Sequence, residues 1–129
     1  GDHYRLAFDK EDSWSIKYNL VWDKLFGLNI FDEDIFTDEV NYYMTKINKY
    51  GLPLDSRSDY TKSDWQMWST VLCNNKEYTD ASVSAMLRML AETPDLVPFT
   101  DWYYSSTASP RGFQNRTVQG GLFINMLKF

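Results

Sequence analysis

The sequence is poor in the residues that build covalent cross-links, metal centres and nucleic-acid interfaces. Its 129 residues include one cysteine, Cys73, so an internal disulfide and a cysteine-based zinc site are both excluded. The one histidine, His3, argues against a histidine-rich metal site or a histidine-based triad supplied by this chain alone. There is no run of lysine and arginine, and no apolar run approaches the roughly 18 residues of a membrane span. We therefore expect no metal, no nucleic-acid partner and no membrane span.

Two further features have a structural explanation. Acidic residues crowd positions 32–39, but they lack the alternating oxygen ligands and the glycine of a calcium-binding EF-hand loop. They fit the start of a helix, whose dipole favours negative charge there. Cys73 lies on an apolar stretch with no histidine beside it, which is typical of a buried packing residue.

Aromatic residues are abundant, with 5 Trp, 9 Tyr and 8 Phe making up 17% of the chain. An apolar content of 43% and a net charge of -5, spread along the sequence, predict one globular domain over residues 1–129. Most of the aromatic side chains are expected to fill space between helices or to cover a surface that a partner domain buries. A minority that lines a groove would suit sugars or other polar small molecules.

Apolar spacing and capping residues predict an all-α fold of antiparallel helix hairpins. The expected helices run from Ser13 to Gly27, from Asp32 to Lys49, from Lys62 to Asn74, from Thr79 to Leu90 and from Thr117 to Leu127. Thr61 or Ser63 is the expected N-cap of the third helix, and Thr79 or Asp80 that of the fourth. The expected buried stripes of the second and fourth helices are Phe36, Val40, Tyr43 and Ile47, and Val83, Met86, Leu87 and Leu90.

The stretch Asn48–Trp68 has the densest polar functionality beside aromatic residues. It begins with a helix end, which we expect left-handed Gly51 to close, followed by a turn at Pro53. The polar loop that follows brings together Asp55, Arg57, Asp59, Tyr60, Lys62 and Asp64. Asp64 lies one turn before Trp68 on the same face, where the helix dipole favours the ionised carboxylate and burial favours the protonated one. Charges beside tryptophans on a fixed loop indicate a site for a polar ligand.

A second polar and aromatic segment covers residues 97–117. It contains Asp101, Trp102, Tyr103 and Arg116, and its Ser, Thr, Pro and Gly content predicts a long loop or an irregular hairpin. Long ordered loops on helical scaffolds are often functional. Because long loops of helix-hairpin arrays gather at one end, we expect the two segments to share a rim.

Four blocks of the sequence resemble the C-terminal part of the glutaminase A family of bacteria and fungi. They are KYNLVWDKLFGLNIF, NKYGLPLDSRSDYTKSDWQMW, TPDLVPFTDWYYSST and GFQNRTVQGGLFINML. The resemblance covers about Arg5 to Leu127. The chain differs from many relatives after its LNIF block, where they have proline and it has Asp32.

The resemblance implies an α/α toroid of the six-helical-hairpin type that follows N-terminal β-rich regions, in proteins that are mostly secreted, periplasmic or in the cell envelope. It also implies hydrolysis of L-glutamine to L-glutamate and ammonia, without a cofactor. Five helices cannot close such a toroid. We therefore expect a C-terminal fragment of a larger multi-domain protein, inactive without its N-terminal domains.

Amide hydrolysis needs an activated nucleophile, donors for the oxyanion and a grip on the α-amino and α-carboxylate groups. The carboxylates proposed as the base or the α-amino partner are Asp55, Asp64 and Asp101. The other proposed substrate contacts are Arg57, Tyr60, Lys62, Trp68, Trp102, Tyr103 and Arg116.

Two alternatives fit the same residues. In a carbohydrate-active toroid, Asp64 and Asp101 would be the acid and the base, with Trp65, Trp68 and Trp102 as stacking platforms for a sugar. In a non-catalytic scaffold or interaction piece, the aromatic residues would face helices that lie outside this chain.

Overall fold

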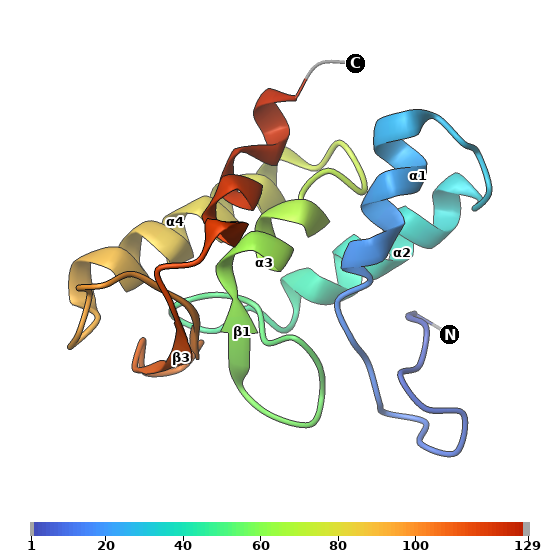
Figure 1. Cartoon of the computed structure of the whole chain (residues 1–129). Coiled ribbons are helices and arrows are strands. Elements are labelled where there is room, and N and C mark those ends of the chain that lie inside the picture. Colours follow the sequence, from blue (N-terminus) through green and yellow to red (C-terminus); the bar gives the residue numbers. More distant parts are fainter. Residues whose placement is uncertain (1, 128–129) are drawn as a thin grey trace.

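A computed structural model describes residues 2–127, and it shows a group of helices with a small antiparallel sheet at one end (Figure 1). The elements in chain order are the 3-10 helix η1 (Tyr18–Leu20), α1 (Val21–Phe26), α2 (Glu33–Met44), β1 (Tyr60–Lys62), α3 (Ser63–Ser69), α4 (Lys76–Glu92), β2 (Thr100–Tyr104), β3 (Pro110–Gln114) and the 3-10 helix η2 (Thr117–Met126). Figure 1 shows α3 in the middle, with α1 and α2 on one side and α4 on the other. Among the described residues, no helix combines the length and the apolar content that crossing a membrane requires.

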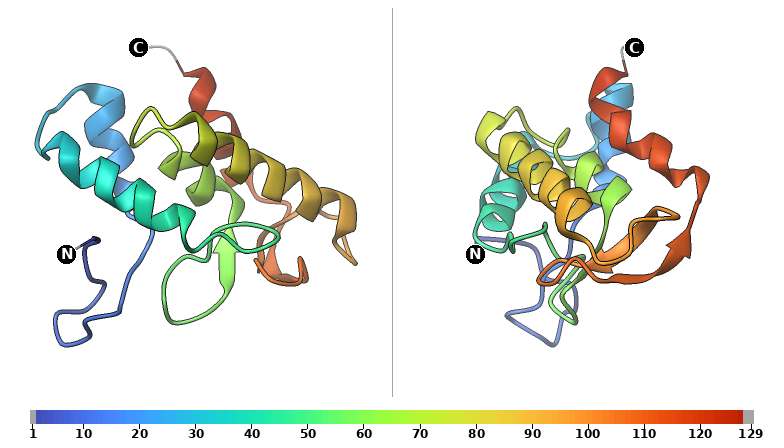
Figure 2. Two further views of the ribbon diagram at one scale, coloured as in Figure 1. Left: turned by 180° about the vertical axis from the view of Figure 1, so that it is seen from behind. Right: turned by 90° about the vertical axis from the view of Figure 1, so that its left-hand side faces the viewer.

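The expected all-α fold is wrong, because three strands form an antiparallel sheet in the order β1-β2-β3. The register pairs Tyr60 with Tyr104 and Lys62 with Trp102, so that a strand directly before α3 joins a hairpin about 40 residues later. Strands β2 and β3 lie within the segment for which the sequence allowed an irregular hairpin. Their aromatic residues suit a half-buried pleated surface better than a solvated loop. In both views of Figure 2 the sheet lies below the last turn of η2.

The first expected helix begins at Tyr18 and not at Ser13. The residues before Tyr18 run extended beside the central loop, where the Ile16 amide donates to the Leu54 carbonyl at 2.8 Å. This pairing satisfies backbone groups that a helix would otherwise use, and it overrides the helical spacing. The stop at Gly27 is confirmed, since Gly27 has a left-handed φ of 59°.

The second expected helix is confirmed over α2, whose buried side includes Phe36, Val40 and Tyr43. The helix ends at Met44, so Ile47 lies beyond it. The third helix is shorter than expected and ends at Ser69. Neither expected side-chain cap is used, because the residue before α3 is the last residue of β1.

Helix α4 begins one turn earlier than expected, because the Asn75 side chain accepts a hydrogen bond from the Tyr78 amide at 2.9 Å. Its buried side is rotated from the expected stripe: Tyr78 and Met89 are buried, whereas Val83 and Leu87 are exposed. The last expected helix forms as η2, a 3-10 helix with non-helical torsion angles at Phe123.

Gln66 of α3 holds the centre of the fold together. Its Oε1 accepts from the Leu52 amide at 2.9 Å, and its Nε2 donates to the Tyr103 hydroxyl at 2.8 Å. The Tyr103 hydroxyl in turn donates to the Tyr50 carbonyl at 2.8 Å. One buried amide therefore links the turn before β1, α3 and β2. Gly51 lies in this turn with a φ of 138°, and it does not close a helix as the sequence had suggested.

Candidate active site

Four charged side chains meet where β1 runs into α3, and we call them the β1–α3 cluster: Lys62, Asp64, Asp101 and Arg116. Arg116 grips Asp101 with two hydrogen bonds, from Nε to Oδ1 at 3.0 Å and from a terminal nitrogen to Oδ2 at 2.5 Å. The Lys62 ammonium lies 3.8 Å from Oδ2 of the same carboxylate. Asp64 and Asp101 are only 3% and 1% exposed, so both carboxyl groups are removed from solvent.

The backbone explains why these residues converge. Lys62 ends β1 and pairs with Trp102 of β2, which places the neighbouring Asp101 beside it. Asp64 follows within the first turn of α3, and Arg116 comes just after β3. The cluster therefore depends on the sheet, the element that the sequence had not predicted as such.

Burial dominates the electrostatics of the cluster. It raises the pKa of Asp64, and the nearby Asp101 carboxylate raises this pKa further, while backbone hydrogen bonds at Asp64 and Trp65 and the charge of Lys62 act to lower it. Of the two opposing effects that the sequence predicted for the Asp64 pKa, burial therefore outweighs the position at the start of the helix. Burial also lowers the pKa of the Lys62 ammonium, Arg116 adds to this decrease, and Asp101 and Asp64 oppose it. A carboxyl group and an amine whose pKa values move toward neutrality are typical of proton-transfer sites.

Several buried polar atoms around the cluster have no hydrogen-bond partner among the described residues. They are Thr61 Oγ1, Ser63 Oγ, Asp64 Oδ1, Thr100 Oγ1 and Trp102 Nε1. Buried polar groups in proteins are nearly always paired, and a concentration of unpaired ones calls for an explanation. A polar ligand that enters beside Asp64 would provide partners.

Aromatic rings surround the Lys62 ammonium. Its Nζ lies 4.2 Å from the ring centre of Phe113, 4.9 Å from that of Trp65 and 5.9 Å from that of Trp102. Cation–π attraction therefore holds this ammonium in place.

Helix η2 packs directly against Asp64. A Cβ atom at Gly121 would come within 2.8 Å of Asp64 Cβ and 2.7 Å of Trp68 Nε1, so only glycine allows this close approach. Gly120 has nothing within 4 Å of its corresponding position. Gly121 thus sets how closely η2 approaches Asp64 and the neighbouring indole of Trp68.

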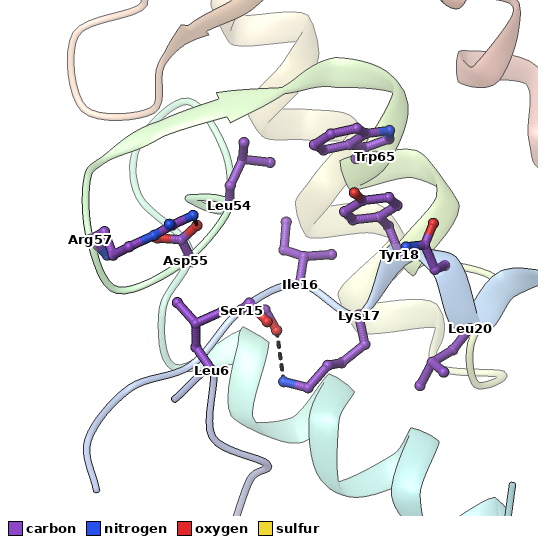
Figure 3. Close-up of a pocket in the computed structure, with 11 residues that line it drawn as sticks. Leu6, Ser15, Ile16, Lys17, Tyr18, Leu20, Leu54, Asp55, Arg57 and Trp65 are labelled. Carbon is purple, nitrogen blue, oxygen red and sulfur yellow. Dashed lines mark hydrogen bonds and ion pairs between the residues drawn. The ribbon is translucent and has the colours of Figure 1, made fainter. Parts of the chain in front are cut away.

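Asp55 and Arg57 lie in a separate open pocket of about 510 Å³ (Figure 3). Arg57 donates to both oxygens of Asp55, at 2.9 and 2.8 Å. Figure 3 shows Trp65 on the pocket wall with its ring parallel to that of Tyr18, and the two ring centres are 3.9 Å apart. Trp65 therefore separates this pocket from Lys62. The pair formed by Asp55 and Arg57 does not join the β1–α3 cluster. Of the two predicted polar segments, the structure therefore brings together the residues of the cluster but not Asp55 and Arg57.

The remaining predicted contacts divide between surface and core. Tyr60 packs edge-on against Trp102, with ring centres 5.3 Å apart, next to the cluster. Tyr103 is 1% exposed, and both of its hydroxyl contacts are within the core, to Gln66 and Tyr50. The substrate roles of all these residues stay predictions.

Phe113 and Arg111 were not predicted as site residues. Arg111 and Phe113 are two residues apart and therefore share one face of β3, but this spacing is informative only when residues 110–114 are treated as a strand. Within residues 2–127, no three His, Cys, Asp or Glu side chains are grouped to hold a metal ion.

The raised pKa of Asp64 predicts a pH-dependent effect of Asp64→Asn on stability. A carboxyl group whose pKa is higher in the folded state opposes folding once pH exceeds its unfolded pKa, near 3.9. We expect Asp64→Asn to raise the melting temperature at pH 7 and to have little effect at pH 3. Calorimetric melts of the wild type and the variant at both pH values test this prediction. A variant that melts at the same temperature as the wild type at pH 7, or at a lower one, contradicts it.

Comparison with known proteins places these features in a family context. The family model described as the glutaminase A six helical-hairpin domain matches residues 1–126. Glutaminase A of Aspergillus oryzae (strain ATCC 42149 / RIB 40) is 33% identical over 128 residues, which cover 97% of this chain and 18% of that protein. A protein of Arthroderma benhamiae (strain ATCC MYA-4681 / CBS 112371) named Probable glutaminase is 28% identical over 155 residues, covering 95% and 18%. This chain thus spans about 18% of the length of these relatives. No solved structure matches it.

Proposed function

This chain belongs to the glutaminase A family, and from that premise we propose that its β1–α3 cluster forms part of the active site at which a longer protein hydrolyses L-glutamine to L-glutamate and ammonia. The observation that carries the proposal is the buried carboxyl group of Asp64, which has an unpartnered oxygen and lies beside Lys62. Keeping such a group out of water destabilises the fold, a feature common in active sites.

The chemistry assigns one role to each member of the cluster. Ionised Asp64 takes a proton from water as the oxygen of that water attacks the side-chain amide carbon of L-glutamine. The Lys62 ammonium donates to the oxyanion of the tetrahedral intermediate. When the C–N bond breaks, the protonated Asp64 returns its proton to the leaving nitrogen, so that ammonia and the new carboxylic acid result. Arg116 fixes the position of Asp101 with two hydrogen bonds, and Asp101 in turn favours the charged form of Lys62.

The rest of the longer protein is proposed to complete this site. An open apolar groove of about 290 Å³ between α4 and η2 is a surface for contact with it, lined by Met67, Val83, Met86, Leu87, Leu90, Leu122 and Phe123.

We also propose that the protein is located outside the cytoplasm, in the secreted or cell-envelope fraction. Fractionation of the source cells tests this location.

Ammonia release from L-glutamine, measured side by side for the longer protein and for this chain, tests the proposal. We expect release by the longer protein and none by the 129-residue chain, because this chain spans only about 18% of the length of its relatives. Activity of neither protein, with the longer one folded, would contradict the proposal. A panel of sugar substrates then tests carbohydrate chemistry.

Gly121→Ala is expected to lower turnover by about tenfold or more in the longer protein, because displacing a reacting group by about 1 Å has an effect of this size. The added methyl group would push against Asp64 and Trp68. Gly120→Ala is the matched control, with open space at the same position one residue earlier, and it should keep full turnover. Equal turnover of the two variants would show that the contact of η2 with Asp64 does not position this carboxyl group for the reaction.

A further inference from the structure

The sheet surface next to the β1–α3 cluster is positively charged, although the chain has a net charge of -5. We call this the cation–aromatic surface, and its members are Tyr60, Lys62, Trp102, Tyr104, Arg111, Phe113 and Arg116. It contains three cations. Among the described residues, the one carboxylate paired with any of them is Asp101, which already binds Arg116 and lies near Lys62.

Arg111 is the cation of this surface that has no carboxylate partner within residues 2–127. Its guanidinium carbon lies 4.7 Å from the ring centre of Trp102, 5.0 Å from that of Tyr60 and 5.5 Å from that of Tyr104. One terminal nitrogen also donates to the Tyr104 hydroxyl. Aromatic faces and a phenol therefore orient this guanidinium without neutralising it, and its other N–H groups remain free to donate to a ligand.

Lys62 and Arg111 both lie close to the same indole. The Lys62 ammonium is 5.9 Å and the Arg111 guanidinium 4.7 Å from the ring centre of Trp102. Phe113 stacks on this indole with ring centres 4.9 Å apart and fixes it. An anionic group placed beside Trp102 is thus within the field of two cations, one of them inside the proposed active site.

We propose that Arg111 recognises the free carboxylate of an amino-acid substrate, beside the Lys62 ammonium of the proposed active site, and is the specificity-determining residue for that carboxylate. The inference rests on the proposed function, since L-glutamine is the ligand considered. A guanidinium presents two parallel N–H groups that match the two oxygens of a carboxylate, and such charge-assisted pairs are the strong ones. A neutral sugar or an uncharged amide gains nothing from the excess positive charge.

Arg111→Gln in the longer protein tests the inference, with ammonia release as the readout. We expect KM for L-glutamine to rise at least about tenfold, as loss of a charge-assisted contact predicts, with kcat nearly unchanged. KM for the α-methyl ester of L-glutamine, which keeps the amino group and the side-chain amide but lacks the carboxylate, should stay the same. Arg111→Lys keeps the charge but not the paired N–H groups, so it should restore only part of the difference between the two substrates.

Arg88→Gln is the matched control, because Arg88 lies on α4 and donates to the Lys49 carbonyl, away from the cation–aromatic surface. It should change neither KM. If Arg111→Gln raises KM equally for L-glutamine and its ester, or for neither, the inference is overturned.

A longer protein that releases no ammonia would overturn the proposed function alone. Calorimetric binding of L-glutamate and of its dimethyl ester then tests the inference on the same preparation. Weaker binding of L-glutamate, but not of the diester, by Arg111→Gln supports it. Equal binding of L-glutamate by wild type and variant, or no binding by the wild type, overturns it.

Discussion

Asp64→Asn in the longer protein is expected to lower kcat for L-glutamine by about a hundredfold or more while the protein stays folded. The amide has nearly the shape of the carboxyl group but can neither accept nor return the proton. Because burial raises the pKa of Asp64, the same substitution removes a group that is held charged against its environment. Loss of activity combined with unchanged or higher thermal stability is the signature of a functional group, since a structural carboxylate would lose stability instead.

Asp80→Asn provides the matched control for Asp64→Asn. Asp80 is an exposed carboxylate of α4 whose ion-pair partner is Lys76. Turnover should remain at the wild-type level in this variant. If Asp64→Asn also retains full turnover, Asp64 is not the proton-transfer group.

Gly51→Ala is expected to destabilise the protein by about 3 kcal/mol or more, as the combined effect of backbone strain and a steric clash. The φ of 138° at Gly51 lies in a region that residues with a Cβ rarely adopt. A Cβ atom there would also come within 2.1 Å of Gln66 Oε1, the oxygen that accepts from the Leu52 amide. Moving Gln66 would break the bonds that connect the central turn to α3 and β2. A urea titration measures the change in the free energy of unfolding.

Gly27→Ala separates strain from clash. Gly27 also has a positive φ, 59°, but nothing lies within 4 Å of its Cβ position, so about 1 kcal/mol is expected. Equal losses at the two glycines would show that the contact with Gln66 does not contribute.

Helix α2 and the stop at Gly27 follow from local sequence, and the structure confirms both. The buried positions Phe36, Val40 and Tyr43 recur at helical spacing, and a glycine suits a left-handed stop. The start of the first helix and the buried side of α4 could not be predicted in this way. Hydrogen bonds to a loop about 40 residues away decide where the first helix starts. The packing of α4 against α3 decides which side of α4 is buried.

The sequence allowed us to predict which residues belong to the candidate site, but not how they are arranged in space. Asp64, Asp101, Lys62 and Arg116 were all among the predicted site residues, and the structure brings them together. The pairing of Lys62 with Trp102 that does so joins a strand of only three residues to a distant hairpin, and single-sequence periodicity has no signal for such a pairing. Asp55 is also a carboxylate and lies closer in sequence to Lys62 than Asp101 does, yet its loop folds to the other side of Trp65.

A crystal structure of the longer protein with L-glutamate, the proposed product, bound to it tests the central claim most directly. The account predicts a ligand carboxylate within hydrogen-bond distance of the Lys62 ammonium or the Arg111 guanidinium, with the Asp64 carboxyl group beside the side-chain carboxylate of the product. L-Glutamate bound at a site that none of these three residues contacts would contradict the account and would show that the β1–α3 cluster is not where the substrate binds.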